Sequence, residues 1–91
     1  MNLRVTVAAS FLAEAKKLPP DRRKAARRAL DKFLVEPSLP SLRFRPLKGA
    51  PNHYIINSVH GDRIILRKSD EATYAAIDVG PHDNVYRRWD R

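Results

Sequence analysis

The stretch HYIINSVHGDRIILR, residues 53–67, decides the fold because it holds two extended apolar runs on either side of Gly61-Asp62. β-branched residues recur in both runs, which favours strands. A Gly-Asp pair between two such runs is typical of a two-residue hairpin turn, in which glycine takes the positive φ that other residues avoid. We therefore predict an antiparallel hairpin with Gly61 and Asp62 as its loop.

A two-residue loop also predicts which side chains share a face of this hairpin. His60 would lie opposite Arg63, and residues that lie opposite each other point to the same side. One predicted face packs on helices and carries Ile55, Asn57, Val59, Ile64, Leu66 and Lys68. The other is predicted to be a half-polar, cationic ligand surface, which carries Tyr54, Ile56, Ser58, His60, Arg63, Ile65 and Arg67.

Upstream of the hairpin, the pattern indicates one strand and a short helix. Apolar residues at 3, 5 and 7 alternate with polar ones, which predicts a strand. Ser10 is a candidate N-cap of the helix that follows. Residues on one helical stripe are predicted to face the core, and they are Phe11, Leu12, Ala15 and Leu18.

A second helix is predicted from Pro20 to about Val35. Proline suits the first position of a helix, and Asp21 in the first turn complements the helix dipole. Its predicted core stripe consists of Ala26, Ala29, Leu30, Phe33 and Leu34. From Lys16 to Arg28 the chain has seven basic residues and one acid. This run is either a solvated helix face or a contact surface for a polyanion or an acidic partner.

A long loop from Glu36 to Asn52, interrupted by four prolines, separates this helix from the hairpin. Loops of this length are often functional. Its basic residues Arg43, Arg45 and Lys48 are candidate RNA-binding residues, together with Tyr54 and His60 of the hairpin. Apolar residues are predicted to hold the loop against the core, and they are Leu39, Leu42, Phe44 and Leu47.

The C-terminal part combines a third hairpin strand, Thr73 to Gly80, with a histidine and a tyrosine. Pro81 ends the strand, so His82 is expected at the rim of the sheet, where its near-neutral pKa suits a general acid or base. Tyr86 could bind a phosphate or stack on a base. The alternative is that His82 caps a turn and Tyr86 packs in the core.

The residues that follow His82 permit one exclusion and leave one alternative open. We do not interpret the neighbouring Asp83 as an orienting partner of His82, because adjacent residues rarely adopt that geometry. The tail from Asp83 to Arg91 either forms a short final helix or frays.

Composition limits the possible functions. The 91 residues are 43% apolar and carry a net charge of +8, which predicts one folded domain, residues 1–91, that binds polyanions. Without cysteine there is no disulfide or thiolate nucleophile, and we expect no metal and no cofactor. No apolar run is long enough to cross a membrane, and the N-terminus lacks a signal-peptide pattern, so we expect a soluble cytoplasmic protein.

The order of a strand, two helices and an antiparallel sheet predicts an α+β fold with a short C-terminal segment. This order, the run GDRIILR and the closing VGPHDNVY resemble the RelE/ParE superfamily of bacterial toxins over essentially the whole chain. The resemblance implies the toxin component of a type II toxin–antitoxin system, held by a cognate antitoxin. For a RelE-like member it implies cleavage of mRNA on the ribosome, by attack of a ribose 2′-hydroxyl on the adjacent phosphate.

The resemblance also implies roles for four residues. His82 would be the acid or base, Arg63 and Arg67 would stabilise phosphate charge, and Tyr86 would position or stack the RNA. The chain departs from RelE in the strand before the hairpin turn, where Tyr54 and Ile56 replace two lysines.

Two other functions are compatible with this sequence. A ParE-like toxin would act on DNA gyrase through protein contacts, and the missing strand lysines favour it. A non-catalytic module of the same fold would bind RNA or protein through its charge alone.

Overall fold

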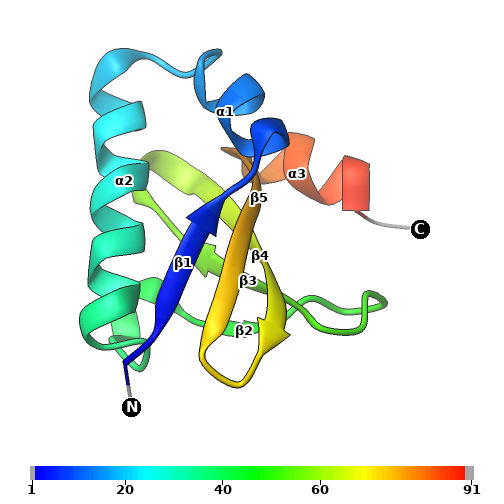
Figure 1. Ribbon diagram of the computed structural model, residues 1–91. Coiled ribbons are helices and arrows are strands. Elements are labelled where there is room, and N and C mark those ends of the chain that lie inside the picture. Colours follow the sequence, from blue (N-terminus) through cyan, green and yellow to red (C-terminus); the bar gives the residue numbers. More distant parts are fainter. Residues whose placement is uncertain (1, 90–91) are drawn as a thin grey trace.

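Five strands form one mixed sheet in the computed structural model, which describes residues 2–89 (Figure 1). The elements are β1 (Arg4–Val7), α1 (Ala9–Ala15), α2 (Pro20–Val35), β2 (Arg45–Pro46), β3 (His53–Asn57), β4 (Asp62–Asp70), β5 (Thr73–Pro81) and α3 (His82–Trp89). The strand order is β1-β5-β4-β3-β2. This arrangement confirms the predicted α+β fold.

The first strand of the chain lies beside the last. β1 pairs with β5 in parallel, with Arg4 opposite Thr73 and Val7 opposite Ala76. All other pairs of neighbouring strands are antiparallel. The two helices between β1 and β2 therefore carry the chain from one edge of the sheet to the other.

Helices α1 and α2 pack with one face of the sheet around Phe33, which is fully buried. Its ring meets Phe44 and Tyr74 with centroid distances of 5.0 and 5.1 Å. The predicted bounds of α2 are confirmed, and Pro20 occupies its first turn. Two residues of the predicted stripes do not reach the core, because Leu12 and Leu34 are 52% and 37% exposed.

The predicted N-cap of α1 is wrong. Ala8 is the N-cap, and Ser10 lies within the helix. The Ser10 hydroxyl instead donates a 2.6 Å hydrogen bond to the carbonyl of Ile77, which ties α1 to β5.

The long loop is partly structured. A 3-10 turn at Pro40–Leu42 precedes β2, which pairs with β3. Leu42 and Leu47 are buried, as predicted, while Leu39 and Phe44 are half-buried against the core.

The predicted two-residue hairpin loop is wrong. Val59–Gly61 form a kinked three-residue turn between the strands, and Asp62 is the first residue of β4. The Ser58 amide donates to the carbonyl of Asp62, so three residues separate this pair. His60 and Gly61 both have positive φ, 57° and 79°, which a longer turn accommodates. Asn57 therefore lies opposite Arg63.

Arg63 was predicted to lie opposite His60, so the observed pairing is displaced by three residues along β3. An odd displacement reverses the predicted faces of β3, while those of β4 are as predicted. Tyr54 and Ile56 point to the α1–α2 side, together with Ile64 and Leu66. Ile55 points to the other side, in a second core cluster with Leu47, Ile65 and Val85. Register errors of one or three residues have this consequence because side chains alternate along a strand.

Asp62 has a structural role that the sequence reading missed. Its carboxylate is fully buried and accepts two hydrogen bonds from Arg22 of α2, with Nε–Oδ2 at 2.9 Å and Nη2 on Oδ1. Such a bidentate pair satisfies a buried carboxylate that would otherwise be costly. It joins α2 to the start of β4.

The C-terminal segment forms α3, which covers the second face of the sheet. Val85 is fully buried against Ile55 and Ile65. Asp83 in the first turn and arginines in the last turn complement the helix dipole. Of the alternatives for the tail, the helix is therefore correct through Trp89, while residues 90 and 91 lie outside the described part.

Candidate active site

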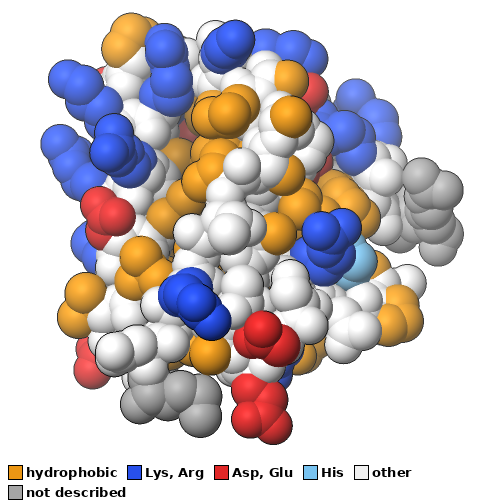
Figure 2. All heavy atoms as spheres, viewed as in Figure 1, with side chains coloured by type: hydrophobic (Ala, Val, Ile, Leu, Met, Phe, Trp, Pro, Cys, Tyr) orange, Lys and Arg blue, Asp and Glu red, His pale blue; other side chains and the backbone are white. Residues whose placement is uncertain are grey.

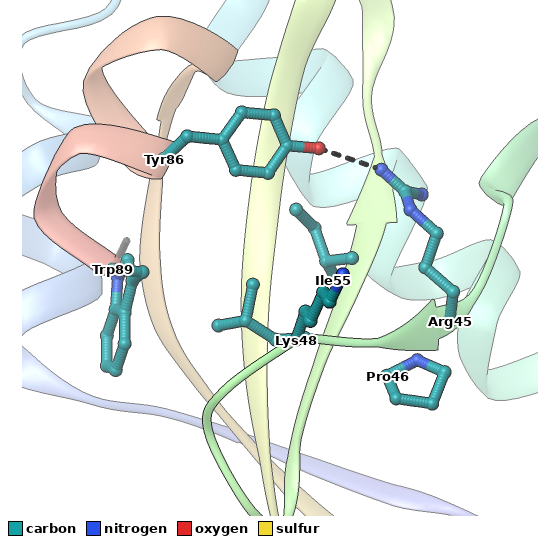
Figure 3. A pocket seen from close by; sticks show the side chains of 7 residues that line it. Arg45, Pro46, Lys48, Ile55, Tyr86 and Trp89 are labelled. Carbon is teal, nitrogen blue, oxygen red and sulfur yellow. Dashed lines mark hydrogen bonds between the residues drawn. The ribbon is translucent and has the colours of Figure 1, made fainter. Parts of the chain in front are cut away.

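Arg45 and Tyr86 meet across the α3-covered face of the sheet (Figure 3). Arg45 lies on β2, and its Nη2 donates a 3.1 Å hydrogen bond to the Tyr86 hydroxyl of α3. Its Nη1 donates to Asn57 Oδ1 at 3.1 Å and to the carbonyl of Arg43. These bonds fix the guanidinium beside the phenol.

Arg63 adds a second cation to this group. It lies on β4 between Asn57 of β3 and Gly80 of β5, and its Nη1 donates to the carbonyl of Asp62 at 3.1 Å. Its Nε is buried and has no hydrogen-bond partner among the described residues. A buried charged donor without a partner is costly, which sets Arg63 apart from an ordinary surface cation.

These two arginines also change the acidity of the phenol. Burial raises the pKa of Tyr86, but the hydrogen bond from Arg45 and the nearby positive charges of Arg45 and Arg63 outweigh it, so the net pKa lies below its usual value. Opposite charge and donated hydrogen bonds favour the ionised phenol. Tyr86 can therefore exchange a proton more readily than an ordinary tyrosine.

His82 is the first residue of α3 and remains open to solvent. Its side chain is 49% exposed, and its ring centroid lies 5.9 Å from that of Tyr86. Its Nδ1 contacts Asp83 Oδ1 at 3.0 Å, a contact that we had not expected between neighbours. The position directly after β5 agrees with the predicted rim, and the contact leaves Nε2 for a ligand.

Beside this cluster lies a hollow of about 430 Å³ between β2 and α3 (Figure 3). Buried Leu47 and Ile55 form its apolar part, and Tyr86 and Trp89 line it from α3. Lys48 also lines it, as Arg45 does, so two of the predicted RNA-binding residues meet here.

Three further predicted site residues lie on β4, in the loop and in the hairpin turn. Arg67 is exposed on the same side of β4 as Arg63, but four residues along, where it lines a separate hollow with Glu14 and Asp78. Arg43 and His60 are exposed residues with positive φ, in the loop and in the hairpin turn.

The predicted placement of Tyr54 on the ligand face is wrong. Its ring lies on the α1–α2 side, 5.1 Å from that of Phe44. Tyr54 and Ile56 are therefore core residues. The β3 residues that face α3 are His53, Ile55 and Asn57. His53 lies at the far end of the strand, where its ring is 5.2 Å from that of Trp89 and its Nδ1 contacts the carbonyl of Pro51.

Sequence reasoning missed two contributors to the site, Asn57 and Asp78. Asn57 shares Arg45 with Tyr86. Asp78 is buried and binds Arg88 and Trp89 of α3. The available signal was an acidic residue inside the apolar strand Ala75–Val79, because a buried carboxylate needs a partner.

A second cationic surface lies on α2. Figure 2 shows Lys and Arg side chains gathered along this helix, at the left of the view. Residues 2–89 contain no group of three histidine or acidic side chains placed to hold a metal ion. No helix within the same range has the length and hydropathy of a membrane span.

No protein-family model and no curated protein sequence matches this chain. Solved structures do match it. A doubly substituted Escherichia coli toxin RelE in the free state is 23% identical, with a TM-score of 0.70, over 96% of this chain and 93% of that one. The chain has the RelE fold.

Two antitoxin–toxin complexes contain the RelE fold as well. The match to the RelB–RelE complex of Methanococcus jannaschii has 22% identity, covers 92% and 98% of the two chains and has a TM-score of 0.71. The match to a RelBE complex of Mycobacterium tuberculosis has 21% identity, covers 89% and 99% and has a TM-score of 0.72. The RelE fold thus extends over nearly the full length of each compared chain.

Proposed function

We propose that this protein is the toxin component of a type II toxin–antitoxin system and cleaves mRNA on the ribosome. The observation that supports it best is the cluster of Arg45, Arg63 and Tyr86, with a buried, unpartnered Arg63 Nε and an exposed His82 beside it. Two fixed cations and two proton-exchanging groups are what phosphoryl transfer from RNA requires.

In the proposed reaction, a ribose 2′-oxygen attacks the adjacent phosphorus and the bond to the 5′-oxygen of the next nucleotide breaks. Arg63 and Arg45 stabilise the charge that develops on the non-bridging oxygens. One proton leaves the 2′-hydroxyl and one joins the 5′-oxygen, and His82 and Tyr86 are the groups placed to exchange them. The products are a 2′,3′-cyclic phosphate and a 5′-hydroxyl end.

Further contacts to the RNA are assigned to exposed cations around the cluster. Lys48 lines the adjacent hollow, while Arg43, His60 and Arg67 lie further out. These residues would bind the phosphate backbone on either side of the cleaved bond, where contact needs charge but no fixed geometry.

The proposed regulator is a cognate antitoxin in the cytoplasm. Toxins of the same fold have been solved in complex with RelB antitoxins. A net charge of +8 favours an acidic partner, because complementary charge accelerates and orients association. The basic side of α2 and the cluster of Arg45, Arg63 and Tyr86 are two cationic surfaces that would suit such a partner.

The test is induction of the chain alone in a bacterium, with mapping of new 5′ ends on abundant transcripts. We expect cuts only within translated regions. Arg63→Ala and His82→Ala should abolish them, whereas Lys24→Ala, which removes an exposed positive charge from α2, should not. Cutting by the first two variants at the wild-type level would contradict the assignment.

A gyrase-directed toxin is the second candidate, because β3 presents Ile55 and Asn57 next to the cluster and neither residue can act as a base. For this function we expect growth arrest and inhibition of DNA supercoiling without new RNA ends. A folded chain that binds RNA but causes neither effect would indicate a non-catalytic module.

A further inference from the structure

Asp78 is the most fully bonded side chain on the α3 side of the sheet. One carboxylate oxygen accepts from Arg88 Nε and Trp89 Nε1, both at 2.8 Å, and the other accepts from Arg88 Nη2 at 2.8 Å and its neighbour Val79 N–H at 2.9 Å. Four donors use essentially all the acceptor sites of a carboxylate. With 5% exposure, Asp78 is therefore a satisfied buried anion.

A β-bulge places Asp78 on this side. Ile65 lies opposite Asp78 and Leu66 lies opposite Ala76, so Ile77 is an extra residue in β5. The bulge lets both Ile77 and Asp78 reach the α3 side, where Ile77 packs against the second core cluster. Bulges commonly redirect side chains next to functional sites.

The bonds of Asp78 hold the last turn of α3. This helix has only eight residues, too few to be stable without tertiary contacts. Val85 packs its middle into the second core cluster, and Arg88 and Trp89 fix its end. Arg88 also approaches Glu14 of α1, with Nη1 and Oε1 3.7 Å apart.

The orientation of α3 determines where the Tyr86 hydroxyl lies. Val85 alone would let the helix roll about one buried side chain, whereas the bidentate Arg88–Asp78 pair defines its rotation. Tyr86 is two residues from Arg88, and it must reach Arg45 of β2 across the hollow.

We propose that Asp78, acting through Arg88 and Trp89, is a positioning residue that sets the rotation of α3 and thereby holds Tyr86 at Arg45 and Arg63. The consequence for cleavage rests on the proposed function, but the placement of the phenol does not. The charged groups that face Tyr86 are Arg45 from β2, Arg63 from β4 and, when protonated, His82 on α3 itself.

The test is a titration of the Tyr86 phenol by carbon NMR of ring-labelled tyrosine, with the signal assigned by Tyr86→Phe. The compared proteins are the wild type, Asp78→Ala, Arg88→Gln and a control, Leu30→Ala, which leaves a cavity on the opposite face of the sheet. In Asp78→Ala and Arg88→Gln we expect the pKa of Tyr86 to return to its ordinary value. We also expect the fluorescence emission of Trp89, the sole tryptophan, to change in both variants. The control should melt at a lower temperature with both signals unchanged.

An unchanged Tyr86 pKa in folded Asp78→Ala or Arg88→Gln protein would overturn the proposal. Arg88 is 38% exposed, so its replacement still decides the question where Asp78→Ala fails to fold. In the cleavage assay, Arg88→Gln should lower kcat by about tenfold to a hundredfold with little change in KM, because misplacement of a reacting group acts on the chemical step. If the wild-type protein does not cleave RNA, the proposed function is refuted, while the titration still tests whether Asp78 positions Tyr86.

Discussion

Arg45 and Arg63 lower the pKa of the Tyr86 phenol. Its hydroxyl is 3.1 Å from Arg45 Nη2, and Arg63 also lowers its pKa. A phenol whose pKa is lower in the folded than in the unfolded protein stabilises the fold at alkaline pH. This contribution is fully present above the unfolded pKa near 10.0 and is lost as the pH falls through the folded pKa.

We therefore predict that the stability difference between wild type and Tyr86→Phe depends on pH. The wild type should gain unfolding free energy relative to the variant between the folded pKa and pH 10, with no such gain at neutral pH. Urea unfolding of both proteins from pH 7 to 10 measures this. A difference that stays constant over the range would show that the arginines do not act on the phenol.

The pair of Arg22 and Asp62 gives the second prediction at this scale. Asp62 is fully buried, so Arg22→Met should leave an uncompensated charge and lower the unfolding free energy by about 3–5 kcal/mol. The double variant Arg22→Met/Asp62→Leu should recover most of this loss, because no buried charge remains. Denaturant unfolding of the single and double variants provides the test, and equal losses in both would contradict it.

At the scale of elements, the hairpin turn determines which side chains reach the site. Gly61 has φ of +79°, a left-handed conformation that disfavours a Cβ atom. Gly61→Ala should therefore cost about 1 kcal/mol of unfolding free energy. The added methyl would meet only His82 Cδ2, at 3.8 Å, so the loss is one of backbone strain. Equilibrium unfolding measures it, with Gly49→Ala, at another position of positive φ, as the comparison.

The same turn shows what local patterns can and cannot predict. Spacing and proline position were sufficient for α2, because a helix is set by neighbours three and four residues apart. The hairpin loop was predicted at residues 61–62 but consists of residues 59–61, because Asp62 was assigned to the turn and not to β4. Its actual place depends on Arg22, which is 40 residues away in the sequence.

The candidate site was predictable where a residue followed strand periodicity, ended a strand or carried a positive charge in the long loop. Arg63 and His82 were found in this way, and Arg45 was found through its charge. Tyr54 was placed on the wrong face because one register error inverts a whole strand. The contact of Arg45 with Tyr86 joins residues 41 apart, and no pattern along the chain encodes it.

At the scale of the whole molecule, the two cationic surfaces should affect RNA differently. Affinity for single-stranded RNA should fall with salt, with a logarithmic slope of roughly −0.7 for each phosphate neutralised. Replacing exposed Arg27 and Arg28 of α2 by Gln should lower general affinity and reduce this slope, while the sites of cleavage stay the same. Replacing Arg45 by Gln should abolish cleavage. Filter binding at several salt concentrations, with 5′-end mapping, compares the variants.

The parallel pairing of β1 with β5 has a consequence for synthesis of the chain. Arg4 finds its neighbour Thr73 only after residues 5–73 have been made. Until then β4 lacks the strand that separates it from β1, and α3 has not yet been synthesised. A nascent or prematurely terminated chain therefore cannot bring Tyr86 to Arg45. The cluster of Arg45, Arg63 and Tyr86 therefore forms only after the ribosome has passed Tyr86.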